Sequence, residues 1–195
     1  MKVSRGDSIL FLSLCSILLH GQQTGRFATL KSQAFTLFER GQYEQVAGKL
    51  EEVWEQDQSD PKVAEYLAIG YLYGERDLNK ARPVMKAAIE RGGQATFLVQ
   101  HSHERSGILG GGPLNNYCTG KMSVVPGKLT FTADSGEHSA TFTAADIKDF
   151  HILGGSPGRV QFKALGKNYV FRGKTEKNDE AEFLEELVTA NVKRK

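Results

Sequence analysis

The sequence is poor in cysteine and in long hydrophobic runs. Cys15 and Cys118 are its two cysteines, and removal of an N-terminal leader would leave Cys118 alone. A single thiol cannot form an internal disulfide, so a fold held by disulfides is excluded. The apolar stretch from Ile9 through Leu19 is shorter than the roughly 20 residues that a bilayer-spanning helix needs. A bundle of membrane helices is therefore not indicated.

The chain also lacks an excess of charge of one sign. Its net charge is +2, and residues 26–92 carry 10 basic and 11 acidic side chains, whereas residues 93–195 carry 13 and 11. Nucleic-acid-binding domains show a clustered basic stripe instead. The 39% of hydrophobic and 25% of charged residues are ordinary for a soluble globular chain. Nucleic acid is thus not expected as a partner.

The N-terminus has the three parts of a secretory signal peptide. Lys2 and Arg5 form a basic head, Ile9 through Leu19 an apolar middle, and Gly21 the small residue before a cut ahead of Gln22. Residues 1–21 are therefore predicted to be a cleaved leader. The mature protein is expected outside the cytoplasm, periplasmic or secreted.

Two alternatives for this segment stay open. Asp7 weakens the positive head, so the segment could instead be retained as an uncleaved N-terminal anchor. Cys15 could carry a lipid, but the bulky Leu14 directly before it disagrees with the small residues usual at such sites.

Helical periodicity extends from Thr29 to Gly92. Pro61 suits the first turn of a helix, where its missing N–H needs no acceptor. Connections as short as those seen here force antiparallel helical hairpins. The predicted helices cover residues 29–39, 43–57, 61–74 and 78–91.

This segment resembles two tetratricopeptide repeats, helix-hairpin units of about 34 residues. The second repeat matches better, and its Gly70 and Ala81 would lie where its two helices cross. Val46 and Pro83 depart from the pattern, and a plain four-helix segment remains the alternative. The resemblance gives a helical domain over residues 27–92. It rests on Ala34, Leu37, Gly41, Gln42, Tyr43, Val46, Leu50 and Val53, then on Tyr66, Ile69, Gly70, Tyr73, Ala81, Met85 and Ala88.

From Ala95 the apolar pattern alternates, which indicates strands. Pro126 and Gly127 predict a hairpin turn, followed by a strand with Leu129 and Phe131 on one face. The predicted strands are 96–101, 118–125, 128–133, 138–143, 147–153, 159–165 and 168–172, and a helix follows at 179–192. The expected inward side chains include Phe142, Ile147, Phe150, Ile152, Val160, Phe162, Tyr169 and Phe171.

Seven short antiparallel strands and one amphipathic helix resemble the pleckstrin-homology-like fold. The resemblance covers residues 95–192 and implies a curved β-barrel or sandwich capped by the C-terminal helix. Another small barrel or sandwich remains the alternative. The fold class expected for the whole chain is α+β.

One catalytic pattern occurs in the sequence. Gly154, Ser156 and Gly158 satisfy Gly-x-Ser-x-Gly, which in esterases places the Ser between a strand and a helix, with a His later in the chain. Here a strand is predicted to follow, and no His occurs after His151. The segment is interpreted as a turn, and the chain is predicted not to be an enzyme.

Two histidines alternate on the first predicted strand. His101 and His103 could point the same way and chelate a metal, with Glu104 as the one nearby addition. A closed site needs three or four ligands, and His138 and His151 could join only through folding. Solvent-facing histidines are the favoured interpretation, so no metal and no cofactor is predicted.

Two candidate binding surfaces follow from the predicted elements. A concave helical surface for a protein or peptide partner is expected from Lys31, Phe35, Phe38, Leu67 and Tyr71, unless these residues are buried against the β domain. A basic face for anions is expected from Lys121, Lys128, Lys163, Lys167 and Arg172.

The resulting prediction is an exported, non-enzymatic interaction or scaffold module that binds a protein or peptide. One alternative is a peripheral envelope protein whose basic β face touches anionic lipid or polymer. The other is a metal-dependent or hydrolytic enzyme.

Overall fold

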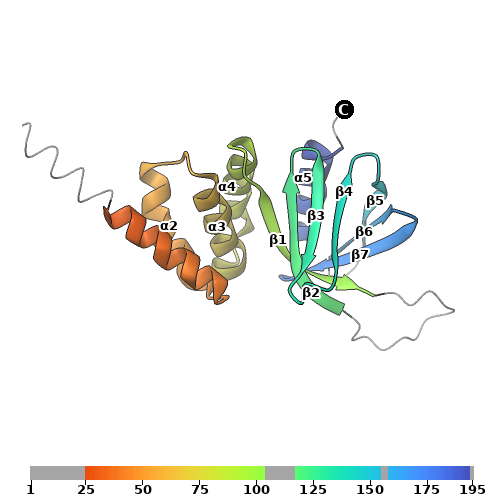
Figure 1. Ribbon diagram of the computed structural model, residues 1–195, viewed down its shortest axis with the longest axis horizontal. Helices are drawn as coiled ribbons and strands as arrows, with labels where there is room; N and C mark the ends of the chain where they lie inside the picture. Colours follow the sequence, from red (N-terminus) through yellow and green to blue (C-terminus); the bar gives the residue numbers. More distant parts are fainter. Residues whose placement is uncertain (1–24, 104–116, 155–157, 194–195) are drawn as a thin grey trace, which may run out of the picture.

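The computed structural model describes residues 25–103, 117–154 and 158–193. Figure 1 shows helices at one end of an elongated molecule and a β-sheet at the other, with the C-terminal helix beside the sheet. The chain is α+β, as the sequence predicts. The predicted leader and Cys15 lie outside the described residues. Within the described part, no helix is both long and apolar enough to cross a bilayer.

The helical unit begins with a helix over residues 25–39, which starts before the predicted residue 29 and ends where predicted. Asp60 caps α3 because its carboxylate accepts the N–H groups of Lys62 and Val63, with Pro61 in the first turn. Asp77 caps α4 through the N–H of Lys80. The further elements are α2 (Tyr43–Gln56), α3 (Pro61–Ile69), η1 (Gly70–Glu75) and α4 (Leu78–Glu90).

The predicted helix 61–74 is in fact two elements, because α3 passes into the π-helical turn η1 at Gly70. The sequence predicts that Gly70 lies against the following helix, but the structure places it against α2. A Cβ at Gly70 would come within 2.7 Å of the Ala47 nitrogen, so the close approach of these two backbones requires glycine. Gly74 lies as closely against Tyr43 at the start of α2.

The β unit is a seven-stranded, fully antiparallel sheet with the order β4-β3-β2-β1-β7-β6-β5. All seven predicted strands are present, each within about two residues of the predicted ends. Their bounds are β1 (Ala95–Ser102), β2 (Tyr117–Val125), β3 (Lys128–Ala133), β4 (Ser139–Thr143), β5 (Lys148–Leu153), β6 (Arg159–Ala164) and β7 (Lys167–Gly173), followed by α5 (Asn178–Asn191).

Chain length forces this sheet to curl. Strands β4 and β5 are the two edges, yet only residues 144–147 join them. In a flat sheet the edges would lie about 29 Å apart, since neighbouring strands are about 4.8 Å apart. The connection spans at most about 18 Å. The edges must therefore approach each other, although the described ladders do not pair them, so the sheet is curled but open.

The inner face of the curled sheet and one side of α5 form the β core. The predicted inward phenylalanines are buried, and Ile152 and Tyr169 pack partly buried against them. Burying one such ring contributes about 1.5–3 kcal/mol. The fully buried rings are Phe97, Phe131, Phe142, Phe162, Phe171 and Phe183.

A buried polar contact joins the helical unit to the β unit. The Tyr73 hydroxyl on η1 donates to Glu180 of α5 at 2.6 Å and accepts the N–H of Leu98 on β1 at 2.8 Å. Thr175 donates to the same carboxylate through its N–H, at 3.0 Å, and through its hydroxyl. Glu180 is only 2% exposed. A Cβ at Gly173 would collide with this carboxylate, so a larger residue there would displace the carboxylate from its hydrogen bonds.

A surface layer of ion pairs extends this joint. Arg82 and Lys86 of α4 both pair with Glu186 of α5, at 3.0 and 2.6 Å. The Arg82 guanidinium also lies 4.5 Å from the centre of the Phe183 ring. The groups at this layer are partly exposed, so each pair contributes little on its own. The buried hydroxyl–carboxylate contact is therefore the stronger constraint on how the two units sit.

We expect Tyr73→Phe to lower the free energy of unfolding by about 2–4 kcal/mol. The substitution keeps the ring but leaves the buried Leu98 N–H without its acceptor and Glu180 without one donor. Urea unfolding measures the change. Tyr71→Phe is the matched control, because that hydroxyl donates to Glu51 at the surface of the helical unit. Equal losses of unfolding free energy in the two variants would contradict a special role of the Tyr73 hydroxyl in joining the two units.

The Glu180 carboxyl gives the joint a pH dependence. Burial is the largest effect on its pKa and raises it above the unfolded value of 4.5, against the opposing donors. A group whose pKa is raised by folding contributes its full stability below its unfolded pKa. This contribution to the free energy of unfolding is lost as the pH rises through the folded pKa. Glu180→Gln should thus lose less stability than the wild type as the pH rises from below 4.5 to neutrality.

Urea unfolding at a series of pH values measures this difference. Glu182→Gln changes an exposed glutamate of the same helix and alters net charge equally. It should keep the wild-type pH profile, and a Glu180→Gln profile parallel to the wild type would contradict the assignment.

Candidate functional site

An open groove of about 460 Å³ lies between the helical unit and the sheet. The helix over residues 25–39 and α3 form one wall, β2 forms the other, and Gly92 and Gly93 lie at the turn between α4 and β1. The groove exists because the two units are joined at η1, α4 and α5, which leaves their other ends apart.

Aromatic rings form the floor of this groove. The Phe38 and Tyr66 rings stack with centroids 4.0 Å apart, and the Phe35 ring meets Tyr66 edge-on at 4.7 Å. Lys121 of β2 reaches across from the sheet, and its ammonium lies 4.9 Å from the Phe38 ring centre. Lys62 covers Phe35 in the same way at 4.6 Å. Two ammonium groups therefore lie over aromatic rings at this groove, and the lining rings of Phe38 and Tyr66 are themselves only 4% and 9% exposed.

One carboxylate also lines the groove, but hydrogen bonds hold it. Glu65 accepts from Gln94 at 2.7 Å and from the Thr96 hydroxyl at 2.6 Å. Neither Lys62 nor Lys121 takes part in an ion pair within 4.0 Å among the described residues. The local charge of the groove is thus positive.

The structure separates the residues predicted for a concave partner surface. Phe38 lines the groove but is only 4% exposed, whereas Phe35 packs edge-on against Tyr66 without lining the groove. Lys31 pairs with Asp60 at 2.9 Å instead of standing free. Leu67 is fully buried, and Tyr71 is 9% exposed, with its hydroxyl donating to Glu51. Leu67 and Tyr71 are therefore core residues and do not line an exposed partner surface.

The residues predicted for anion binding fall into two groups, with β1 between them in the sheet. Lys121 and Lys128 belong to β2 and β3, whereas Lys163, Lys167 and Arg172 belong to β6 and β7. Lys163 pairs with Asp149 at 3.1 Å. Arg172 donates to Gln100 of β1 and lies over the Tyr117 ring. The separation means that the five groups do not share one hairpin.

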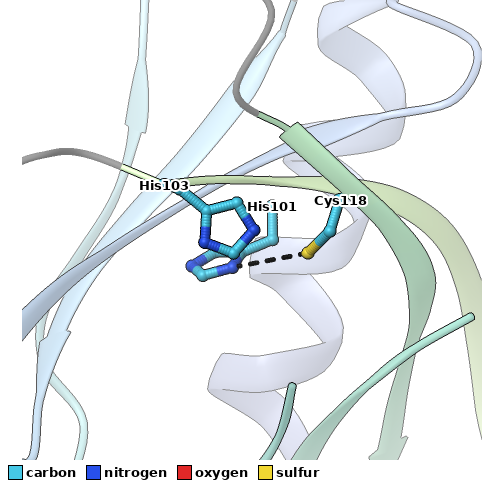
Figure 2. Close-up of side chains that lie close together, drawn as sticks. All are labelled: His101, His103 and Cys118. Carbon is cyan, nitrogen blue, oxygen red and sulfur yellow. Dashed lines mark hydrogen bonds between the residues drawn. The ribbon is translucent and has the colours of Figure 1, made fainter. Parts of the chain in front are cut away.

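A second cluster, of two histidines and a cysteine, lies where β1 ends and β2 begins (Figure 2). His101 faces Cys118 across the β1–β2 ladder, and the Cys118 sulfur lies 3.8 Å from Nδ1 of His101. His103 projects to the same side two residues later, where its ring meets that of His101 at 4.9 Å. The candidate donor atoms of all three residues lie within 4.8 Å of one another.

A third histidine approaches this cluster from the turn before β4. The ring of His138 lies 4.7 Å from that of His103. The sequence leaves open whether His138 or His151 joins the pair, and the structure places His138 there. His151 lies on β5, where its Nδ1 contacts the carbonyl of Asp149. Glu104, the ligand suggested by sequence spacing, lies outside the described residues.

The prediction of solvent-facing histidines is wrong for His101. Its ring packs among the rings of Phe131, Tyr169 and Phe171, with centroids 4.9–5.8 Å away. Burial is the main cause that lowers the pKa of His101 to about 4, and the neighbouring histidines lower it further. Its imidazole is therefore neutral at neutral pH and keeps a nitrogen lone pair. Partial burial also raises the pKa of the Cys118 thiol.

The Gly-x-Ser-x-Gly segment connects β5 to β6, two antiparallel neighbours. This setting agrees with the interpretation as a turn and differs from the strand-to-helix setting of esterases. Ser156 itself lies outside the described residues.

Comparison of the chain with known protein families gives no match. Comparison with curated proteins also gives no match.

Proposed function

We propose that this protein is an exported, non-enzymatic interaction module that binds an acidic peptide segment of a partner in the groove between its helical and β units. The single observation that carries the proposal is the stacked pair of Phe38 and Tyr66 in the groove floor, with the ammonium group of Lys121 over Phe38 and that of Lys62 over Tyr66. The groove volume of about 460 Å³ suits a peptide segment, and the positive local charge favours an acidic one. Export is part of the proposal and depends on the N-terminal sequence alone.

Two finer assignments of fold belong to this proposal. The helical hairpins are taken as two degenerate tetratricopeptide-like repeats, and the curled sheet with α5 as a pleckstrin-homology-like domain. The strand order, with β1 between β2 and β7 and the edges approaching each other, supports the second assignment. Both are folds that usually bind other molecules, although function depends on the site and not on the fold.

The groove chemistry favours a peptide that combines a carboxylate with an apolar side chain. Carboxylates form charge-assisted hydrogen bonds with lysine, and these are stronger than neutral ones. An aromatic floor adds apolar contact area and favours planar or apolar side chains. Gln94 and Thr96 donate hydrogen bonds to the Glu65 carboxylate, so its charge is partly compensated within the protein.

Replacing Lys62 and Lys121 together by Ala should weaken binding of a short acidic, Phe-containing peptide at least about 10-fold, since each lost charged contact contributes more than 1 kcal/mol. Fluorescence anisotropy with a labelled peptide measures the affinity. The matched control is the double substitution Lys128→Ala and Lys167→Ala, which removes the same charge from exposed positions outside the groove. Equal losses in both variants would show nonspecific charge attraction and contradict the groove.

Export is tested separately. The intact mass of the protein from the extracytoplasmic fraction of its native host should correspond to a chain that begins at Gln22. A full-length chain found only in the cytosol would contradict the leader.

A further inference from the structure

We propose that His101, His103 and Cys118, joined by His138, form a binding site for a borderline transition-metal ion such as Zn²⁺. The proposal rests on the convergence of three donor side chains at the end of β1 and the start of β2, whose donor atoms lie within 4.8 Å of one another. The ring of His138, in the turn before β4, lies 4.7 Å from that of His103. The proposal is independent of the groove, because the donors and the groove lysine Lys121 lie on opposite faces of the sheet.

The donor atoms are already spaced almost as a metal would hold them. Zn–N bonds of 2.0–2.1 Å and Zn–S bonds of about 2.3 Å in a tetrahedron place neighbouring donors about 3.3–3.7 Å apart. The Cys118 sulfur lies 3.8 Å from Nδ1 of His101, and the three donors lie within 4.8 Å of one another. Side-chain rotations that move the donor atoms by about 1 Å or less are enough to close this shell.

The backbone holds the donors where they are. His101 and Cys118 are directly paired residues of the β1–β2 ladder, which continues through eight consecutive pairs. The His101 ring is further fixed among Phe131, Tyr169 and Phe171. A prearranged site of this kind loses little conformational entropy when an ion binds. His103 lies just beyond the last ladder pair and His138 in a turn, so these two can adjust.

The donor set selects the class of ion. Imidazole suits zinc, copper, iron and nickel, and thiolate favours softer ions, whereas Mg²⁺ and Ca²⁺ prefer oxygen ligands. Imidazole nitrogen and thiolate sulfur are both ligands that zinc takes in four-coordinate, tetrahedral sites. Cys118 binds the ion as a thiolate. Its thiol proton is therefore released to solvent, one proton for each ion bound.

The site lies at the end of the β1–β2 ladder away from α5. Cys118 is near the start of β2, whereas the turn after β2 contacts α5 through the N–H of Gly127 and the carbonyl of Asn191. The far end is therefore plugged by α5, and the donor cluster is at the other end. All three donors that share the cluster are partly exposed, so an ion can reach them without opening the core.

Titration of the metal-free mature protein with Zn²⁺, followed by calorimetry, should give one ion per chain. Thermal unfolding with Zn²⁺ at about 100 times its dissociation constant should shift Tm upward by about 5–10 °C. Co²⁺ should produce the near-ultraviolet charge-transfer absorption of a thiolate–cobalt bond. Mg²⁺ should produce neither effect.

The variants His103→Ala and Cys118→Ala should each weaken Zn²⁺ binding at least about 100-fold, because each removes a ligand and not only a supporting group. Cys118→Ala should also abolish the charge-transfer band. His151→Ala is the matched control, since His151 lies on β5 outside the cluster. His101→Ala is avoided because the partly exposed His101 ring also packs against Phe131, Tyr169 and Phe171, so its loss would disturb that packing as well.

Circular dichroism of the metal-free variants separates loss of the site from loss of the fold. Folded variants with wild-type affinity, or a wild type without stoichiometric binding, would overturn the proposal. His138→Ala tests the fourth ligand, and an unchanged affinity there would limit the site to three protein donors.

Discussion

The contact between Tyr73 and Glu180 determines how the two units of this protein sit against each other. One hydroxyl donates to a carboxylate on α5 and accepts an amide from β1, so three elements meet at one buried atom. A buried carboxylate is tolerated only with its hydrogen bonds made, and Thr175 supplies the others. The contact links residues 107 positions apart in the chain.

The consequence is most visible in β1. In a strand with one solvent-exposed face, buried and exposed residues alternate, as they do in β3 (Lys128–Ala133). Ala95 through Val99 are instead buried without interruption, because α3 and α4 cover the outer face of β1 while the core covers the inner one. Thr96 and Leu98 face the helices, where they meet Glu65 and Tyr73. The same strand then carries His101 on its inner face.

The periodicity of the sequence predicted the elements well and their assembly poorly. Leu129 and Phe131 alternate with polar residues, and the strand follows directly from that pattern. Glu180 looks like an ordinary first-turn acidic residue of α5, and nothing near it in sequence suggests burial. Likewise Cys118 lies beyond a long connection from His103, so no local rule fixes its register opposite His101. The π-helical turn at Gly70 depends on contact with α2, which the local pattern does not contain.

Both proposed sites depend on the same pair of strands, used on opposite faces. On β2, Lys121 points to the groove. Cys118 and the buried Met122 are each an odd number of residues from Lys121, so both lie on the opposite, inner face of the sheet. The β1–β2 ladder is therefore the common support, and the helical unit stabilises it from outside through Leu98. Because successive side chains of a strand point to opposite faces of the sheet, a ligand on one face does not contact the side chains that line the other. Ion binding on the inner face and peptide binding on the outer face are thus expected to act as separate functions of one rigid body.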